Sequence, residues 1–167
     1  GIMLSFAIKK YSDYYGVACG KKNIFFTNND TAYESAISLF NKGINVEAII
    51  DIREKSESSI VKEAENLGIK IYWSHTVVDT HGYKRLKKIS VMGLSKDGQS
   101  FSGPKKSILE CDCLGVAGGW TPAVHLFTQS GGKLKFRDED QVFIPNIYPS
   151  KQISIGSSNG DFELDKI

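Results

Sequence analysis

The residues best suited to bind a ligand lie in a short turn at residues 27–30, which reads Thr-Asn-Asn-Asp. This turn follows an apolar run at residues 24–26 and precedes a segment with helical periodicity, so it joins a strand to a helix. Turns of this kind bind the diphosphate of a dinucleotide through the free amides at the helix N-terminus. Thr27, Asn28, Asn29 and Asp30 are therefore candidate cofactor-binding residues.

The glycines of a dinucleotide fingerprint are missing from this turn, where Thr27, Asn29 and Ala32 occupy the three glycine positions. Thr31 and Glu34 fit a capping box, in which the Thr31 hydroxyl accepts from the Glu34 amide and the Glu34 carboxylate reaches back. Such a cap would satisfy the amides that a phosphate needs. The asparagine side chains would also obstruct a close approach, so we expect dinucleotide binding at this turn to be weak or absent.

An acid at the end of the next strand is a further candidate. Asp51 follows an apolar run at residues 46–50, about twenty residues beyond the turn, where an acid accepts a hydrogen bond from a ribose hydroxyl. Arg53, two residues later, would instead suit the 2′-phosphate of NADP. A third interpretation is a solvated ion pair at the strand end, and the sequence leaves the three readings open.

Three glycines complete the set of candidate cofactor-binding residues. Gly118 and Gly119 end an apolar strand at residues 107–118. There they would let the backbone approach a ligand at the carboxyl edge of a sheet, or form a tight turn with positive φ. Gly156 follows a further predicted strand at residues 153–155.

The three histidines show no pattern of a catalytic or metal site. His75 and His81 share no spacing with a carboxylate or a third ligand, so we interpret them as residues of turns and rims. His125 lies between Val124 and Leu126 and is expected to be a packed, hydrogen-bonded histidine. No catalytic residue and no metal ligand is assigned.

The three cysteines, Cys19, Cys111 and Cys113, form neither a CxxC redox pair nor a zinc-ligand set. The close pair has a one-residue spacer inside an apparently buried strand. We therefore expect reduced, buried thiols.

Strands and helices alternate through the segments that carry these residues. The segments are strand 24–26, helix 31–42, strand 46–50, helix 56–67 and strand 69–73. Right-handed crossovers would make the three strands parallel neighbours. Residues 76–79 and 87–94 then suggest antiparallel strands around a turn at His81 and Gly82. The expected fold is α/β: a Rossmann-like three-layer domain with a parallel sheet and a small antiparallel meander.

Residues 1–15 are expected to form an amphipathic helix. Its predicted apolar stripe consists of Leu4, Ala7, Ile8, Tyr11, Tyr14 and Tyr15. Because this helix opens almost at the first residue, we hypothesise that the chain is cut from a longer one.

The composition is that of an ordinary globular protein, with 167 residues, 41% hydrophobic and 24% charged. The net charge of +2 favours neither nucleic acid nor an anionic membrane as a partner. The one dense basic cluster, at residues 84–88, is interpreted as a solvated strand face. No apolar run reaches the ~20 residues that span a bilayer and no signal peptide is visible, so a cytoplasmic location is expected.

Residues 115–134, which read GVAGGWTPAVHLFTQSGGKL, closely resemble the α subunit of heterotetrameric sarcosine oxidase. The resemblance extends to residues 26–33, FTNNDTAY, and to residues 1–4, GIML. It implies the NAD(P)-binding domain of a flavoprotein-reductase-like fold. Residues 1–20 would be a connecting helix, residues 21–119 the inserted second domain, and residues 120–167 the return into the flanking nucleotide-binding domain.

The resemblance implies a flavoenzyme assembly that oxidatively demethylates sarcosine to glycine, an oxidoreductase acting on CH–NH donors. NAD is implied for a part of the full subunit that is missing here, and flavin for the partner subunits. The segment itself would be catalytically silent. Two alternatives are an NAD(P)H-binding domain of a flavin-dependent reductase and a non-catalytic assembly module of an opine or other amine dehydrogenase complex.

Overall fold

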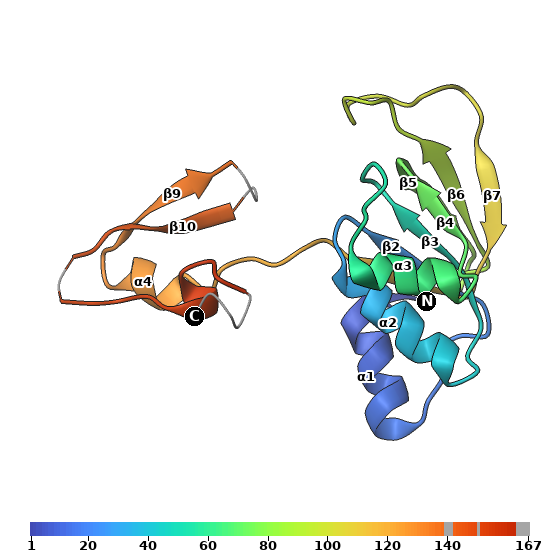
Figure 1. Ribbon diagram of the computed structural model, residues 1–167, viewed down its shortest axis with the longest axis horizontal. Coiled ribbons are helices and arrows are strands. Elements are labelled where there is room, and N and C mark those ends of the chain that lie inside the picture. Colours follow the sequence, from blue (N-terminus) through green and yellow to red (C-terminus); the bar gives the residue numbers. More distant parts are fainter. Residues whose placement is uncertain (139–141, 150, 163–167) are drawn as a thin grey trace. The chain divides into compact units, whose positions relative to one another are not determined.

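The computed structural model describes residues 1–138, 142–149 and 151–162. It divides into two compact units, Gly1–Gly119 and Trp120–Ile167 (Figure 1). No helix in these described ranges is long and apolar enough to cross a membrane.

A five-stranded parallel sheet forms the centre of the first unit, with the strand order β1-β8-β2-β3-β4. Its strands are β1 (Ile2–Leu4), β2 (Asn23–Thr27), β3 (Val46–Asp51), β4 (Ile71–Trp73) and β8 (Cys113–Ala117). Thr27 pairs in register with Asp51 on one side and with Ala117 on the other. The carboxyl ends of β2, β3 and β8 therefore meet at one edge, which we call the carboxyl edge.

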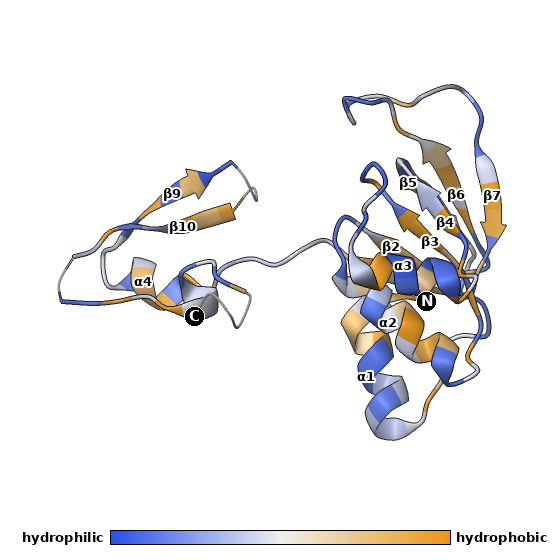
Figure 2. Cartoon of the chain, viewed as in Figure 1, coloured by the Kyte–Doolittle hydropathy of each residue, from blue (hydrophilic) through white to orange (hydrophobic). Residues whose placement is uncertain are grey.

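Three helices cover one face of this sheet: α1 (Ser5–Tyr15), α2 (Thr31–Asn41) and α3 (Ser59–Asn66). Phe25 and Ile49 point from the sheet into a core that includes Ala32 and Ala36 of α2 and Val61 of α3. Figure 2 shows hydrophobic residues concentrated on the central strands and hydrophilic residues on α3, as the amphipathic pattern of the sequence predicts.

A three-stranded antiparallel meander covers the other face, with β5 (His75–His81), β6 (Lys88–Gly93) and β7 (Ser107–Glu110) in that order. Ile89 and Val91 of β6 pack against Ile24 and Ile50 of the parallel sheet. Between the two sheets, Ser74 has a φ of 52°, a backbone conformation that is uncommon for a residue with a side chain. The α/β fold with a parallel sheet and a meander is thus confirmed.

The start of the chain differs from the expected helix at residues 1–15. β1 comes first and pairs with β8, and α1 begins only at Ser5. The buried face of α1 is Ser5, Ile8 and Ser12, whereas Tyr14 and Tyr15 are 78% and 66% exposed. Leu4 and Tyr11 of the predicted stripe are exposed as well, and only Ile8 of that stripe is fully buried.

Gly115 of β8 leaves room for the buried residue Ile8 of α1. A Cβ atom at Gly115 would lie 2.9 Å from Ile8 Cδ1 and 2.7 Å from Phe25 Cδ1, so a larger residue there would push the helix away from the sheet. The helix is held against α2 by Asp13, which pairs with Lys9 and Lys42 and accepts from Ser38.

The second unit contains a helix, an antiparallel hairpin and a 3-10 turn. These are α4 (His125–Gln129), β9 (Lys133–Arg137), β10 (Val142–Ile147) and η1 (Gly156–Ser158). The prediction missed this hairpin. It also placed a strand at residues 153–155, which have no regular secondary structure and where Ile153 and Ile155 are exposed.

The cysteines are free thiols, with Cys111 and Cys113 buried and Cys19 partly exposed. Burial raises the pKa of the Cys111 and Cys113 thiols to about 11. Burial also raises the pKa of Cys19 above its ordinary value. The prediction of buried, reduced thiols is correct for two of the three residues. The expected single strand at residues 107–118 is instead split between β7 and β8, with Cys111 between them.

These thiols should lower stability at alkaline pH. The folded state keeps both thiols protonated, whereas the unfolded chain ionises them above about pH 8.5. The free energy of unfolding should therefore fall as the pH rises from about 9 to about 11. Urea titrations at successive pH values would measure this, with the Cys111→Ala/Cys113→Ala variant as a control that shows a smaller fall. An equal fall in both proteins would contradict the assignment to these thiols.

Candidate functional site

The turn after β2 is held by hydrogen bonds within the turn itself. The buried Thr27 hydroxyl donates to the carbonyl oxygen of Asn29 at 2.8 Å and accepts from the Asn29 amide at 3.0 Å. Asparagine tolerates the backbone conformations of tight turns, and the Thr27 hydroxyl supplies the closing contacts. The turn therefore forms without the glycines of a dinucleotide fingerprint.

The start of α2 differs from the predicted capping box. Asp30 precedes the helix with helical dihedral angles, φ −78° and ψ −15°, and its side chain makes no capping hydrogen bond. A capping box needs an extended residue at the N-cap, and here Thr31 is already the first helical residue. The side chain of Asn29 takes over this role, because its Oδ1 accepts from the Thr31 amide at 3.0 Å and from the Thr31 hydroxyl.

The Asn29 carboxamide thus occupies an amide that a phosphate oxygen would need. In a dinucleotide-binding unit, the diphosphate accepts from free amides at this end of the helix. Here a neutral oxygen of the chain itself accepts from the Thr31 amide. The turn does satisfy an amide at the start of α2, as expected, but the acceptor is the Asn29 side chain and not the predicted Thr31 hydroxyl.

Asp51 lies at the centre of a buried network. Its side chain has 0% exposure and accepts from the Tyr33 hydroxyl at 2.8 Å. Arg53 donates to it from the backbone amide at 3.0 Å and from the guanidinium NH2 group at 2.8 Å. The same guanidinium binds Asp30 at 2.8 Å. We refer to Asp30, Tyr33, Asp51 and Arg53 as the Asp51 network.

Charge and burial shift the ionisation of this network. Burial, followed by the hydrogen bond to Asp51, raises the pKa of the Tyr33 hydroxyl far above its ordinary value. Burial lowers the pKa of Arg53, but the hydrogen bonds to Asp51 and Asp30 outweigh this and raise that pKa overall. Tyr33 is therefore a neutral donor and Arg53 a permanent cation. The interpretation of Asp51 and Arg53 as a solvated pair is wrong for Asp51, which is buried.

Gly118 and Gly119 lie beside the turn at the carboxyl edge. The Asn28 side chain donates to the Gly118 carbonyl oxygen at 3.3 Å, and the Asn28 amide donates to the Ala117 carbonyl at 3.4 Å. Gly119 has a φ of 97°, so a residue with a side chain would be strained there. The closest atoms to a Cβ built at Gly119 are those of the Asn28 and Asn29 side chains.

Seven of the eight candidate residues thus lie at one edge of the first unit. The eighth, Gly156, belongs to the second unit, where it begins η1 with a φ of 58°. Sequence reasoning missed Tyr33, although its position on the apolar face of α2, next to Ala32 and Ala36, marked it as buried. A buried tyrosine needs a hydrogen-bond partner, and the acid at the end of the neighbouring strand was available.

The polar groups at this edge already bind one another. The Asp51 carboxylate already accepts from a tyrosine and an arginine, so it has little capacity left for a ribose hydroxyl. Asp30, Asp51 and Arg53 together carry a net negative charge, which repels a diphosphate. Two hollows of about 230 and 340 Å3 lie elsewhere, and neither is lined by a candidate residue.

The histidines take part in local hydrogen bonds or face solvent. The Nδ1 atom of His75 lies 2.6 Å from the Trp73 carbonyl oxygen. The Nε2 atom of His81 lies 2.6 Å from Ser90 Oγ and 3.8 Å from Asp79. A serine–histidine–acid relay would place the acid on the other ring nitrogen, so this trio is no such relay.

His125 is exposed at the first position of α4, contrary to the expectation of a packed histidine. The buried side chain of that helix is Phe127. Among the described residues, no cluster of three or more histidine, cysteine, aspartate or glutamate side chains is placed to hold a metal.

Comparison with known proteins confirms the resemblance inferred from the sequence. The chain is 34% identical over 165 residues to the sarcosine oxidase subunit alpha of Corynebacterium sp. (strain P-1). It is 31% identical over 150 residues to the corresponding subunit of Rhizobium meliloti (strain 1021). These matches cover 98% and 86% of this chain but only 16% and 13% of the two relatives. No protein-family model matches the chain.

Solved structures with a similar fold include two thioredoxin reductases. The thioredoxin reductase of T. acidophilum superposes with a TM-score of 0.56 at 18% identity, covering 93% of this chain and 49% of the reductase. That of Lactococcus lactis gives 0.58 at 13% identity, covering 96% and 54%. At these identities the similarity concerns the fold alone.

Proposed function

We propose that this chain, which matches about one sixth of a sarcosine oxidase α subunit, is a structural segment of a sarcosine-oxidase-like α subunit and is catalytically silent by itself. The whole assembly would oxidatively demethylate sarcosine to glycine. The observation that carries this proposal is the Asp51 network. It fills with protein groups the place where a related domain would hold the ribose and diphosphate of a dinucleotide.

The proposal extends to the organisation of the full subunit. Residues 1–20 would connect to the preceding domain, residues 21–119 would be the inserted Rossmann-like domain, and residues 120–167 would return to the flanking nucleotide-binding domain. NAD would bind in that flanking domain and flavin in partner subunits. The partners would be the other subunits of a heterotetramer, in the cytoplasm, with neither nucleic acid nor a membrane involved.

A second candidate function is an NAD(P)H-binding domain of a flavin-dependent reductase. Its specific support is Arg53 beside Asp51, and the glycine pair next to the turn. Arg53 would have to leave two carboxylates in order to bind a 2′-phosphate, which makes this candidate the weaker one. A third candidate is a non-catalytic assembly module of an opine or other amine dehydrogenase complex. A carboxyl edge that is filled by its own side chains would suit such a module as well.

A titration with NAD, NADH and NADPH tests the main proposal. Calorimetry on the 167-residue chain is expected to show no binding up to millimolar ligand, because the amides and the acid are already occupied. Given sarcosine and oxygen, the same preparation should release no hydrogen peroxide. Micromolar affinity for any of the three nucleotides would overturn the structural assignment, and turnover would overturn catalytic silence.

Replacing Asn29 and Asp30 with glycine should improve nucleotide binding. The double variant frees the Thr31 amide and removes one carboxylate from the helix start. Loss of the partly exposed Asp30–Arg53 pair costs about 1 kcal/mol or less, and loss of the Asn29 cap costs about 1 kcal/mol, so the fold should persist. An affinity that is unchanged in calorimetry, with a circular dichroism spectrum that is also unchanged, would show that these two side chains do not block the site.

A further inference from the structure

The meander is the basic layer of the first unit. Residues 75–110 contain seven lysine and arginine residues and three aspartate and glutamate residues, a net charge of +4. The entire chain has a net charge of only +2, so the rest is slightly acidic. Four of the seven cations lie within residues 84–88, which sequence reasoning assigned to a solvated strand face. In the structure, all but Lys88 belong to the turn between β5 and β6.

This turn, residues 82–87, has a constrained backbone. The Lys87 amide donates to the His81 carbonyl oxygen at 2.8 Å and closes the turn. Gly82 has a φ of 149°, and a Cβ atom there would lie 1.9 Å from the Arg85 carbonyl oxygen. Only glycine fits this position, so the path of the turn is fixed by the fold.

The backbone donors of the turn lack acceptors in the protein. In the described part of the chain, the amides of residues 83–86 make no hydrogen bond. Consecutive free amides in a turn form a concave site that attracts anions. The side chains of Lys84, Arg85 and Lys87 likewise form no ion pair within the described ranges, whereas Lys106 of the same layer pairs with Asp79.

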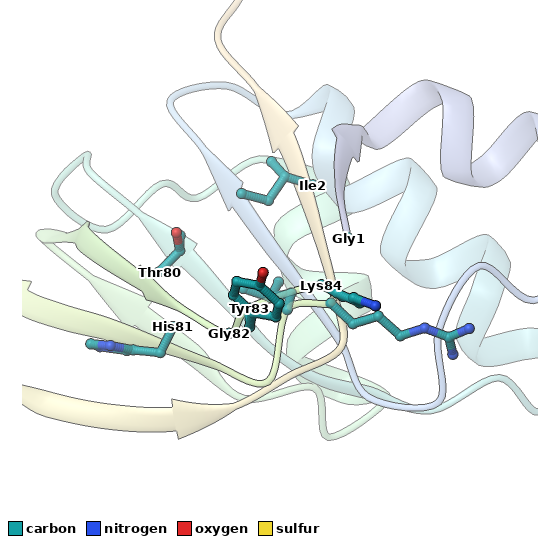
Figure 3. A pocket seen from close by; sticks show the side chains of 9 residues that line it. Gly1, Ile2, Thr80, His81, Gly82, Tyr83 and Lys84 are labelled. Atoms are coloured by element: carbon teal, nitrogen blue, oxygen red, sulfur yellow. The ribbon is translucent and has the colours of Figure 1, made fainter.

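A hollow of about 230 Å3 lies against this turn. It is lined by Gly1, Ile2 and residues 80–86. Figure 3 shows Tyr83 between Thr80 and Lys84, with Ile2 across from them and the His81 ring pointing away. Tyr83 is 96% exposed, which leaves an aromatic face at the rim. The hollow thus combines cations, free amides and an apolar wall.

We propose that this turn binds the oxyanion group, phosphate or carboxylate, of a small anionic ligand. Lys84 and Arg85 would supply the charge, the amides of residues 83–86 would supply directed hydrogen bonds, and Tyr83 with Ile2 would contact the uncharged part of the ligand. The alternative to a binding site is a solvated basic turn, which would attract anions only diffusely and without a defined stoichiometry.

The site is separate from the candidate residues at the carboxyl edge. β5 starts next to the end of β4, so the far end of β5 returns toward the amino ends of the parallel strands. Glu110, paired in register with Lys88, forms an ion pair with Lys22 just before β2. The turn therefore lies at the edge opposite to Asn28 and Gly118, and its binding does not depend on the function proposed above.

Amide chemical shifts of the 15N-labelled 167-residue chain would test this site. Sodium phosphate and sodium succinate are titrated in separate arms at constant ionic strength. Saturable shifts confined to Ile2 and residues 80–88 are expected in at least one arm, and the tighter arm identifies the oxyanion. The Lys84→Gln/Arg85→Gln variant should weaken binding by at least about tenfold, as for the loss of a charge-assisted hydrogen bond.

The matched control is Lys10→Gln/Lys21→Gln, which removes the same charge from exposed positions elsewhere. It should leave the affinity unchanged. Shifts that never saturate, shifts spread over all basic segments, or equal weakening in both variants would overturn the proposal and leave only diffuse counterion attraction.

Discussion

Asp51→Ala is expected to lower the free energy of unfolding by about 3–5 kcal/mol. The substitution removes a fully buried carboxylate that accepts from Tyr33 and Arg53. It leaves the Tyr33 hydroxyl without its acceptor and the Arg53 guanidinium, 30% exposed, without its buried partner. Because the guanidinium keeps the Asp30 carboxylate and some contact with water, the loss should fall toward the lower end of that range.

Urea unfolding followed by circular dichroism would measure the effect. Glu54→Ala, an exposed acid three residues along the chain, is the matched control and should change stability by less than about 0.5 kcal/mol. Tyr33→Phe removes one hydrogen bond and should cost about 1–2 kcal/mol. If Asp51→Ala were no more harmful than Glu54→Ala, the Asp51 network would have no structural role and a ligand-binding role would regain support.

Local patterns in the sequence predicted the central part of the fold. Strand β2, helix α2 and strand β3 follow from an apolar run, a helical period, a glycine stop and a second apolar run. The meander was also predicted, from strand-like runs at residues 76–79 and 87–94 and the turn at His81 and Gly82, although β7 was assigned to a longer strand at residues 107–118. These elements are set by short-range periodicity, and their partners are close in sequence.

Prediction from the sequence failed for the elements whose buried face or pairing is set by tertiary contacts. The tyrosines of α1 have the spacing of a buried stripe, yet the helix buries Ser5, Ile8 and Ser12, with Ile8 packed beside Gly115 of β8. The hairpin of β9 and β10 was missed although β9 alternates polar and apolar residues. Its partner β10 contains Pro145, which has no amide to donate to a strand ladder, and the pairing shifts register there, so β10 lacks the pattern of a regular strand.

The sequence predicted where the candidate site lies but not which hydrogen bonds its side chains make. Parallel strands carry the turn, Asp51 and the glycine pair to one edge, as the topology requires. The capping by Asn29 and the hydrogen bond from Tyr33 to Asp51 depend on side-chain geometry that no spacing rule contains. Those two contacts change the site from a damaged nucleotide fingerprint into one filled by its own side chains.

Arg53→Met separates the two main interpretations of this edge, because they predict opposite results. If Arg53 serves the Asp51 network, its removal leaves a buried carboxylate without its cation. The free energy of unfolding should then fall by about 3–5 kcal/mol, as for loss of one partner from a buried pair. Methionine keeps much of the apolar stem, so this loss is attributable to charge rather than to packing.

If Arg53 instead binds the 2′-phosphate of NADPH, the unmodified chain should bind NADPH more tightly than NADH. Arg53→Met should then abolish that preference with little loss of stability. Urea unfolding and parallel calorimetric titrations would measure both quantities, with Lys21→Met as the exposed control. A large loss of stability without any NADPH preference identifies Arg53 as a structural cation. The guanidinium now binds two carboxylates, and a phosphate would have to displace both, which is why we expect the loss of stability.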